Sequence, residues 1–258
     1  MSRISSVFQN PGHTALIPYV TVGYPNLETT LKAVPLLTAN GADIIELGIP
    51  FSDPLADGAT IQESSFQALQ NGVNIHTCLE VARKLRHITA APLVFMTYFN
   101  PVLKYGVDRF CQACIQAGVD GLILPDLPPE EGVPLECAAA EKGLDMIYLL
   151  SPTSTAERIH LVAEKSRGFI YLVSIAGVTG AREGLPPGLG TFIARVRSVA
   201  KLPLCVGFGI SNPSQAREIS RLADGVIVGS RLIELMKADP DLNSLQIFIR
   251  ELRKAMDG

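Results

Sequence analysis

The sequence predicts an α/β protein, a (β/α)₈ or TIM barrel formed as a single domain over residues 1–258. Short β-branched runs alternate with amphipathic stretches along the chain, a pattern typical of parallel sheets with helical crossovers. Eight such runs match a closed barrel better than an open doubly wound sheet. With 47% hydrophobic and 18% charged residues, the chain is long enough for one large core.

The expected strands are rich in Val, Ile, Leu and Phe and end near Gly, Pro or Ser. They cover residues 15–23, 43–50, 92–99, 121–127, 145–152, 169–175, 202–210 and 225–230. Helical patterns lie between them and often end at a Gly that turns the chain into the next strand. Examples are residues 26–42, 76–88, 107–118 and 128–143. In such a barrel the carboxyl ends of the strands carry the site.

Composition narrows the function to small-molecule chemistry. The net charge is −3 and the basic residues are scattered, so we expect no nucleic-acid partner. The apolar runs fall short of the roughly 18 residues that span a bilayer, and the N-terminus lacks an export pattern. Five cysteines, an odd number, indicate reduced thiols. We therefore expect a cytoplasmic protein without a membrane partner.

Metal-binding patterns are weak. Cys111 and Cys114 form a C-x-x-C, but their segment has a helical pattern and no second ligand pair follows at a suitable spacing. The four histidines are dispersed along the chain. We interpret these residues as structural and expect no metal site.

The segment "DIIELGIPFSDPLADG", residues 43–58, places an acid inside a strand. Alternation puts Glu46 on the inner face with Gly48, which we expect to leave space for a ligand. The opposite, helix-facing side then carries Ile45, Leu47 and Ile49. An inward carboxylate loses hydration, so its pKa should rise toward neutrality, where it can exchange protons. The alternative is a structural acid paired with an Arg or a hydroxyl.

Three further acids lie at strand ends. Asp57 is a candidate functional carboxylate, with a turn or N-capping role beside Gly58 as the alternative. Asp53 precedes a proline and fits a turn or a contact residue. Asp126 either orients a substrate or caps a helix that begins near Pro129.

The last third of the sequence predicts a phosphate site. Glycines and hydroxyls follow the last three strands, in residues 173–184, 206–211 and 226–230. Glycine lets backbone N–H groups approach an anion, and a helix N-terminus after the last strand adds a favourable dipole. The alternative is that these glycines only form tight turns.

Elimination narrows the chemistry. A Schiff-base aldolase needs a Lys at a strand end, but the lysines fall in helical patterns, except Lys104, which we expect in a loop. A metal aldolase needs clustered His ligands. Acid–base chemistry by carboxylates on a phosphorylated substrate remains.

The chain also resembles a known family over essentially its whole length. The motifs "ELGIPFSDPLADGATIQ", "TYFNPV", "LPDLPPEE", "GVTGAR", "GFGIS" and "VGS" occur in the order and spacing of the tryptophan synthase alpha subunit. The resemblance implies a TIM barrel that cleaves indole-3-glycerol phosphate to indole and glyceraldehyde 3-phosphate without a metal or organic cofactor. Glu46 matches the glutamate that protonates indole C3, and Asp57 matches the aspartate that stabilises the indole N–H.

The resemblance also implies roles for other residues. Thr179 matches a loop residue that helps to position Asp57, and Tyr171 matches a substrate-side residue. The phosphate pocket would be formed by Gly180, Gly209, Gly229 and Ser230. The walls of the indole pocket would be formed by Tyr19, Ile61, Met96, Tyr98, Ile123 and Phe208. Tyr19 stands where a Phe is common, Val228 where a Ser is common, and Ile175 with Ala176 replaces a more polar pair.

The family works as an alpha-beta-beta-alpha heterotetramer, whose beta subunit alone holds pyridoxal phosphate. Pro50 and Asp53 resemble residues at the contact between the subunits. The main alternative is a stand-alone indole-3-glycerol phosphate lyase that releases free indole. A phosphate-binding isomerase of the same pathway fits the motif around Glu46 and Asp57 poorly, and a non-catalytic activating subunit would not need both acids.

Overall fold

The computed structural model describes residues 1–173, 185–207 and 209–258. Their parallel strands form one nearly closed barrel, in the order β5-β4-β3-β2-β1-β9-β8-β7-β6. The strands are β1 (Ala15–Thr21), β2 (Ile45–Gly48), β3 (Leu93–Met96), β4 (Gly121–Ile123), β5 (Asp145–Ile147), β6 (Leu149–Leu150), β7 (Ile170–Val173), β8 (Leu204–Gly207) and β9 (Gly225–Val228).

The expected eight-stranded barrel is confirmed, with one correction at the fifth strand. There the chain forms β5 and β6, separated by Tyr148, because it changes its pairing partner from β4 to β7. The carbonyl oxygen of Tyr148 accepts a hydrogen bond from the amide of Tyr171 at 3.0 Å. The two ends of the sheet are therefore consecutive parts of one segment, which brings the barrel close to closure.

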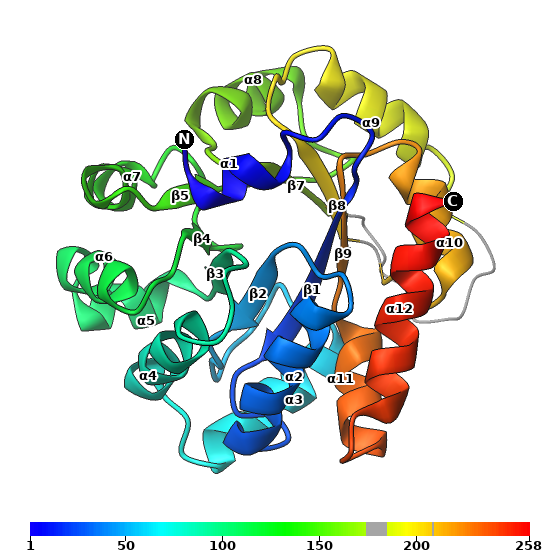
Figure 1. The fold of residues 1–258 in the computed structure, drawn as a ribbon. Helices are drawn as coiled ribbons and strands as arrows, with labels where there is room; N and C mark the ends of the chain where they lie inside the picture. Colours follow the sequence, from blue (N-terminus) through cyan, green and yellow to red (C-terminus); the bar gives the residue numbers. More distant parts are fainter. Residues whose placement is uncertain (174–184, 208) are drawn as a thin grey trace.

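Helices surround the strands in Figure 1. They are α1 (Arg3–Val7), α2 (Leu27–Ala39), α3 (Ala59–Gln70), α4 (Ile75–Arg86), α5 (Phe99–Tyr105), α6 (Val107–Gln116), α7 (Val133–Lys142), α8 (Ala156–Lys165), α9 (Leu189–Arg197), α10 (Pro213–Ser220), α11 (Ser230–Ala238) and α12 (Asn243–Asp257). Asparagine caps begin several of them: Asn26 accepts a hydrogen bond from the amide of Thr29 at 2.9 Å before α2.

Two sequence expectations about the helices are wrong. Lys104 lies in α5 and not in a loop, since "FNPVLKY" forms a short helix directly after β3. The helix expected from Pro129 begins only at Val133, after turns through Pro128 and Glu131. The turns leave residues 125–129 free to line the rim of the barrel.

The core has two layers, as the alternation along 43–50 predicts. Leu47 packs in the cluster between barrel and helices, together with Ile45 and Ile49. Ile44 packs in the inner cluster, which fills the barrel with residues such as Ile17. Glu46 shares the inner face and has no exposed surface.

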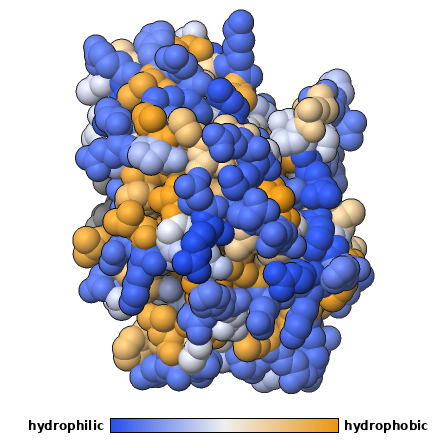
Figure 2. Space-filling view, turned by 90° about the vertical axis from the view of Figure 1, so that its left-hand side faces the viewer, coloured by the Kyte–Doolittle hydropathy of each residue, from blue (hydrophilic) through white to orange (hydrophobic). Residues whose placement is uncertain are grey.

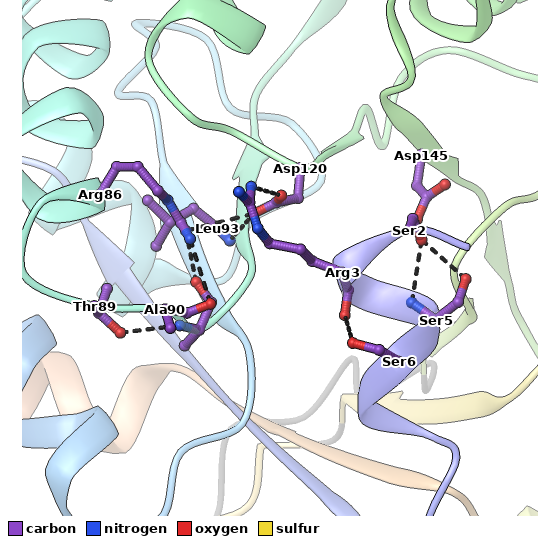
Figure 3. A network of polar contacts seen from close by, with 11 residues as sticks. Ser2, Arg3, Ser5, Ser6, Arg86, Thr89, Ala90, Leu93, Asp120 and Asp145 are labelled. Atoms are coloured by element: carbon purple, nitrogen blue, oxygen red, sulfur yellow. Dashed lines mark hydrogen bonds and ion pairs between the residues drawn. The ribbon is translucent and has the colours of Figure 1, made fainter.

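Helix α1 closes the N-terminal end of the barrel. Its Ile4 inserts into the inner cluster, and Arg3 Nη1 lies 2.8 Å from Asp120 Oδ1. Asp120 also accepts hydrogen bonds from Arg86 at 3.4 Å and from the amide of Leu93 at 2.9 Å, while Ser2 bonds to Asp145 (Figure 3). The site must therefore lie at the other end.

The surface and the cysteines carry little special chemistry. Hydrophilic and hydrophobic residues are interspersed on the side of the molecule shown in Figure 2. Among the described helices, none is long and apolar enough to cross a bilayer. Cys111 and Cys114 are buried on α6, and all five cysteines are free. No cluster of three or more His, Cys, Asp or Glu in the described ranges could hold a metal.

Candidate active site

A cavity of about 650 Å³ opens at the carboxyl ends of the strands. Its lining comes from nearly every strand end, as expected for a barrel of this type. The residues are Tyr19, Ala56, Asp57, Gly58, Ile61, Met96, Leu124–Pro129, Tyr148–Ser151, Ser154, Arg158, Tyr171, Val173, Gly207, Gly209, Ile227, Gly229 and Ser230. Apolar side chains such as Ile61 and Met96 share this lining with polar ones such as Asp57, which is typical of a small-molecule site.

Glu46 lies on β2 inside the barrel. It is fully buried, and neither carboxylate oxygen has a hydrogen-bond partner among the described residues. The described residues therefore offer no Arg or hydroxyl partner of the kind that a structural acid would need. Burial, and then the nearby Asp57 carboxylate, raise the pKa of Glu46 to about 8. At neutral pH the group is largely protonated and can donate a proton.

Gly48 does not leave the expected space for a ligand. A Cβ atom there would lie 2.1 Å from the hydroxyl oxygen of Tyr19, whose ring fills the position. Sequence reasoning missed this because the occupant comes from the neighbouring strand, β1. The glycine thus accommodates a protein side chain.

Asp57 lies in a turn before α3 and lines the cavity. Burial raises its pKa to about 6, against the opposing effect of a hydrogen bond from the Tyr98 hydroxyl. Gly58 is the N-cap of α3, and that cap has no side-chain hydrogen bond. The structure does not support the N-capping alternative for Asp57, which leaves its carboxylate available to a ligand.

The other two acids have structural contacts. Asp126 lines the cavity but also accepts hydrogen bonds from the amide of Phe99 at 2.9 and 3.0 Å. It therefore caps α5, not the helix expected after Pro129. Asp53 is exposed and accepts a hydrogen bond from Ser52 at 2.5 Å, whereas Pro50 is buried within the chain.

The predicted phosphate residues lie partly within the described chain. Gly209, Gly229 and Ser230 line one side of the cavity, where α11 begins. Gly229 is the N-cap of α11 without a side-chain hydrogen bond, so the first amides of the helix have no side-chain cap. Thr179, Gly180 and Phe208 lie outside the described residues, as do Ile175 and Ala176.

The expected indole walls divide into two groups. Tyr19, Ile61 and Met96 line the cavity, as does Tyr171. Tyr98 lies behind the Asp57 turn, where its hydroxyl accepts a hydrogen bond from the amide of Ala56 at 2.9 Å. Ile123 belongs to the inner cluster and is not among the cavity-lining residues.

Sequence reasoning missed part of the cavity wall. Ser151, Ser154 and Arg158 line it after β6, as Pro128 and Pro129 do after β4. The rule that strand ends carry the site could have found the serines, because Ser151 lies at the end of the fifth expected strand and Ser154 just after it. Arg158 could not be found in this way, because it lies on α8 and lines the cavity only through the position of that helix.

Comparisons with known proteins identify the family. The family model described as tryptophan synthase alpha chain matches residues 6–256. The tryptophan synthase alpha chain of Dehalococcoides mccartyi is 59% identical over 100% of both chains, and that of Chloroflexus aurantiacus is 48% identical over 99% of both. The chain belongs to the tryptophan synthase alpha chain family.

Solved structures agree with this assignment. A tryptophan synthase structure from M. tuberculosis matches with a TM-score of 0.92 and 37% identity, over 100% of this chain and 99% of that chain. Tryptophan synthase subunit alpha from Legionella pneumophila matches with a TM-score of 0.92, 38% identity and the same coverage. As a member of the tryptophan synthase alpha chain family, the protein is a lyase of tryptophan biosynthesis.

Proposed function

We propose that the chain cleaves indole-3-glycerol phosphate to indole and glyceraldehyde 3-phosphate, with Glu46 as general acid and base and Asp57 as the charge-stabilising group. The observation that carries this proposal is Glu46, a fully buried carboxyl group without a hydrogen-bond partner in the described chain. Its pKa, raised to about 8, keeps a proton available at neutral pH.

The proposed reaction balances with these two carboxyl groups. Glu46 donates its proton to C3 of the indole ring, and the positive charge that develops on the ring is stabilised by ionised Asp57 through the ring N–H. The Glu46 carboxylate then removes the proton of the adjacent glycerol hydroxyl. The electrons of that O–H bond form the aldehyde carbonyl. The electrons of the broken carbon–carbon bond return to the ring and release indole.

The substrate phosphate would bind on the side of the cavity that ends β8 and β9. Gly209, Gly229 and Ser230 line that side, and the N-terminal amides of α11 begin there. Backbone amides and the positive end of a helix dipole favour an anion. Gly180 would complete this pocket, with Thr179 and Phe208 as further substrate contacts and Tyr171 on the substrate side.

Family membership implies a beta-subunit partner, and we propose an alpha-beta-beta-alpha heterotetramer. Pyridoxal phosphate would belong to the beta subunit, while this chain uses carboxyl groups alone. The turn near Pro50 and Asp53 is the proposed contact, supported by Leu55, which is 94% exposed there. Five free cysteines support a reducing, cytoplasmic setting, and the single, nearly closed barrel supports one domain.

Indole release from indole-3-glycerol phosphate tests the proposal. The assay compares wild type, Glu46→Gln and Asp57→Asn, each with and without a tryptophan synthase beta subunit. We expect weak activity alone, strong stimulation by the beta subunit, and a loss of at least about 100-fold in each variant. Glu164→Gln, an exposed change on α8, is the matched control.

Each other result has a defined meaning. Full activity without the beta subunit would favour a stand-alone lyase. Wild-type rates in Glu46→Gln would remove Glu46 from the mechanism. An isomerase or a purely activating subunit would release no indole in any mixture.

A further inference from the structure

Tyr19 does more than supply an apolar wall. Its ring lies across Gly48 inside the barrel, at the base of the cavity, and the residue is 7% exposed. A phenylalanine would fill the same volume, so packing alone does not explain the hydroxyl group. The contacts of that hydroxyl point to a polar role.

The Tyr19 hydroxyl is anchored by two buried hydroxyl groups. Thr21 Oγ1 donates a hydrogen bond to it at 3.3 Å, and Ser64 Oγ lies 2.6 Å from Thr21 Oγ1. Both Thr21 and Ser64 have no exposed surface. Ser64 Oγ also lies 2.8 Å from the carbonyl oxygen of Ile61, so its single proton has two acceptors within reach, Thr21 Oγ1 and the backbone of α3.

This arrangement leaves one donor unused. Because Tyr19 accepts the proton of Thr21, its own phenolic proton is free to be donated. No acceptor for it is found among the described residues. A buried donor without an acceptor is costly unless a group in the site uses it at some stage.

Glu46 is the neighbour that needs such a donor. Tyr19 and Glu46 are partners in the register of β1 and β2, strands roughly 4.8 Å apart, and both side chains point into the barrel. The carboxylate oxygens of Glu46 have no partner in the described chain. Once Glu46 has given up its proton, a buried negative charge remains, and its cost depends on finding a donor.

None of the other titratable groups that interact with Glu46 lies on a strand next to β2. Asp57, Tyr171 and Cys205 interact with it electrostatically, and no cation among the described residues offsets its burial. Asp57 has Tyr98 as its own donor. The Tyr171 hydroxyl lies over Gly207 and interacts electrostatically with Glu46 from β7, which does not adjoin β2, so Tyr171→Phe is the comparison variant in the test below.

We propose that Tyr19 is a positioning residue, whose hydroxyl donates a hydrogen bond to the Glu46 carboxylate after that group has released its proton. The inference rests on the proposed catalytic role of Glu46 and deepens it. Tyr19 stabilises the charged state between the two proton transfers. Thr21 and Ser64 hold the phenol in place for that contact.

The test measures the titration of Glu46 by carbon-13 NMR, in protein labelled at the glutamate carboxyl carbons. The Glu46 signal is assigned as the one that is absent from Glu46→Gln. In Tyr19→Phe the ionised form loses a donor, so Glu46 should titrate at least about half a pH unit higher than in wild type. Thr21→Val should produce a smaller shift in the same direction. Tyr105→Phe, which removes a hydroxyl on α5 that does not line the cavity, is the matched control.

Activity gives a second readout. We expect a kcat about tenfold lower in Tyr19→Phe, with KM within about twofold, because the lost bond serves the charged intermediate. A shift of less than half a unit in Tyr19→Phe, or a larger one in Tyr171→Phe, would overturn the proposal. If Tyr19→Phe does not fold, the shift in Thr21→Val decides. A fully active Glu46→Gln would instead refute the proposed function. The two failures can be distinguished, because the titration of Glu46 is measured without turnover.

Discussion

Tyr98, which follows β3, holds the turn after β2 through its hydroxyl. The hydroxyl lies within hydrogen-bonding reach of the Asp57 carboxylate and accepts a hydrogen bond from the amide of Ala56 at 2.9 Å. The bond to Asp57 favours its ionised form, whereas burial favours the protonated form. Asp57 therefore ionises at about pH 6, below the pKa of about 8 of Glu46. Near neutral pH, Asp57 is therefore largely ionised while Glu46 is largely protonated.

We expect kcat/KM to follow a bell-shaped pH profile. Activity should rise as Asp57 ionises at about pH 6 and fall as Glu46 loses its proton at about pH 8. In Tyr98→Phe the ionised form of Asp57 loses a donor, so the acid limb should move up while the alkaline limb stays. Rates between pH 5 and 9 measure both limbs, with Tyr105→Phe as the control. An unchanged acid limb would contradict the prediction.

Glu46 should make the folded chain less stable as the pH rises. Between about pH 4.5 and 8 the folded state keeps a proton that the unfolded state has released. The free energy of unfolding then falls with pH by up to about 1.4 kcal/mol per unit from this group. Glu46→Gln should lose less stability over that window. Urea unfolding of both proteins at pH 5 and pH 8 measures the difference, and parallel curves would count against a raised pKa.

A negative charge at the start of α11 should weaken phosphate binding. In Ser230→Asp a carboxylate would occupy the helix N-terminus beside Gly229, where it suits the helix but repels a phosphate. We expect KM to rise about tenfold or more with little loss of thermal stability. Asn74→Asp places the same charge at the N-cap of α4, which does not line the cavity, and should leave KM unchanged. Equal KM values in both variants would exclude phosphate from this position.

Charge reversal at the exposed turn tests the proposed partner contact. In Asp53→Lys we expect the beta-subunit concentration that gives half-maximal stimulation to rise on the order of tenfold. The activity of the variant without beta subunit should stay within about twofold of wild type. Glu80→Lys, an exposed reversal on α4, is the matched control. The measurement is indole release during titration with beta subunit. Identical titration curves for the two variants would place the interface elsewhere.

Asp120 should be the main polar anchor of the closed end of the barrel. Asp120→Ala removes the acceptor of Arg3, Arg86 and the amide of Leu93 (Figure 3). Arg86 is half-buried, so we expect a loss of roughly 2–4 kcal/mol in the free energy of unfolding. Urea unfolding measures this loss, with Glu80→Ala as the control variant. A loss equal to that of the control would show that packing of Ile4 alone holds α1.

Local periodicity was enough to predict the barrel and the inward direction of Glu46. Successive side chains of a strand alternate between its faces, so the position of Glu46 relative to Ile45 and Leu47 follows from the order of residues alone. A glycine followed by a helical pattern also predicted that a helix begins after the last strand, and Gly229 is the N-cap of α11, which starts at Ser230.

Only the tertiary structure decided which groups meet. Tyr19 fills the space over Gly48, Asp126 caps α5, and the fifth strand divides at Tyr148, each through a partner distant in sequence. The lack of a described partner for Glu46 is likewise a property of the whole barrel. A sequence pattern fixes the direction in which a side chain points, but its pKa and contacts depend on neighbours that only the closed barrel brings together.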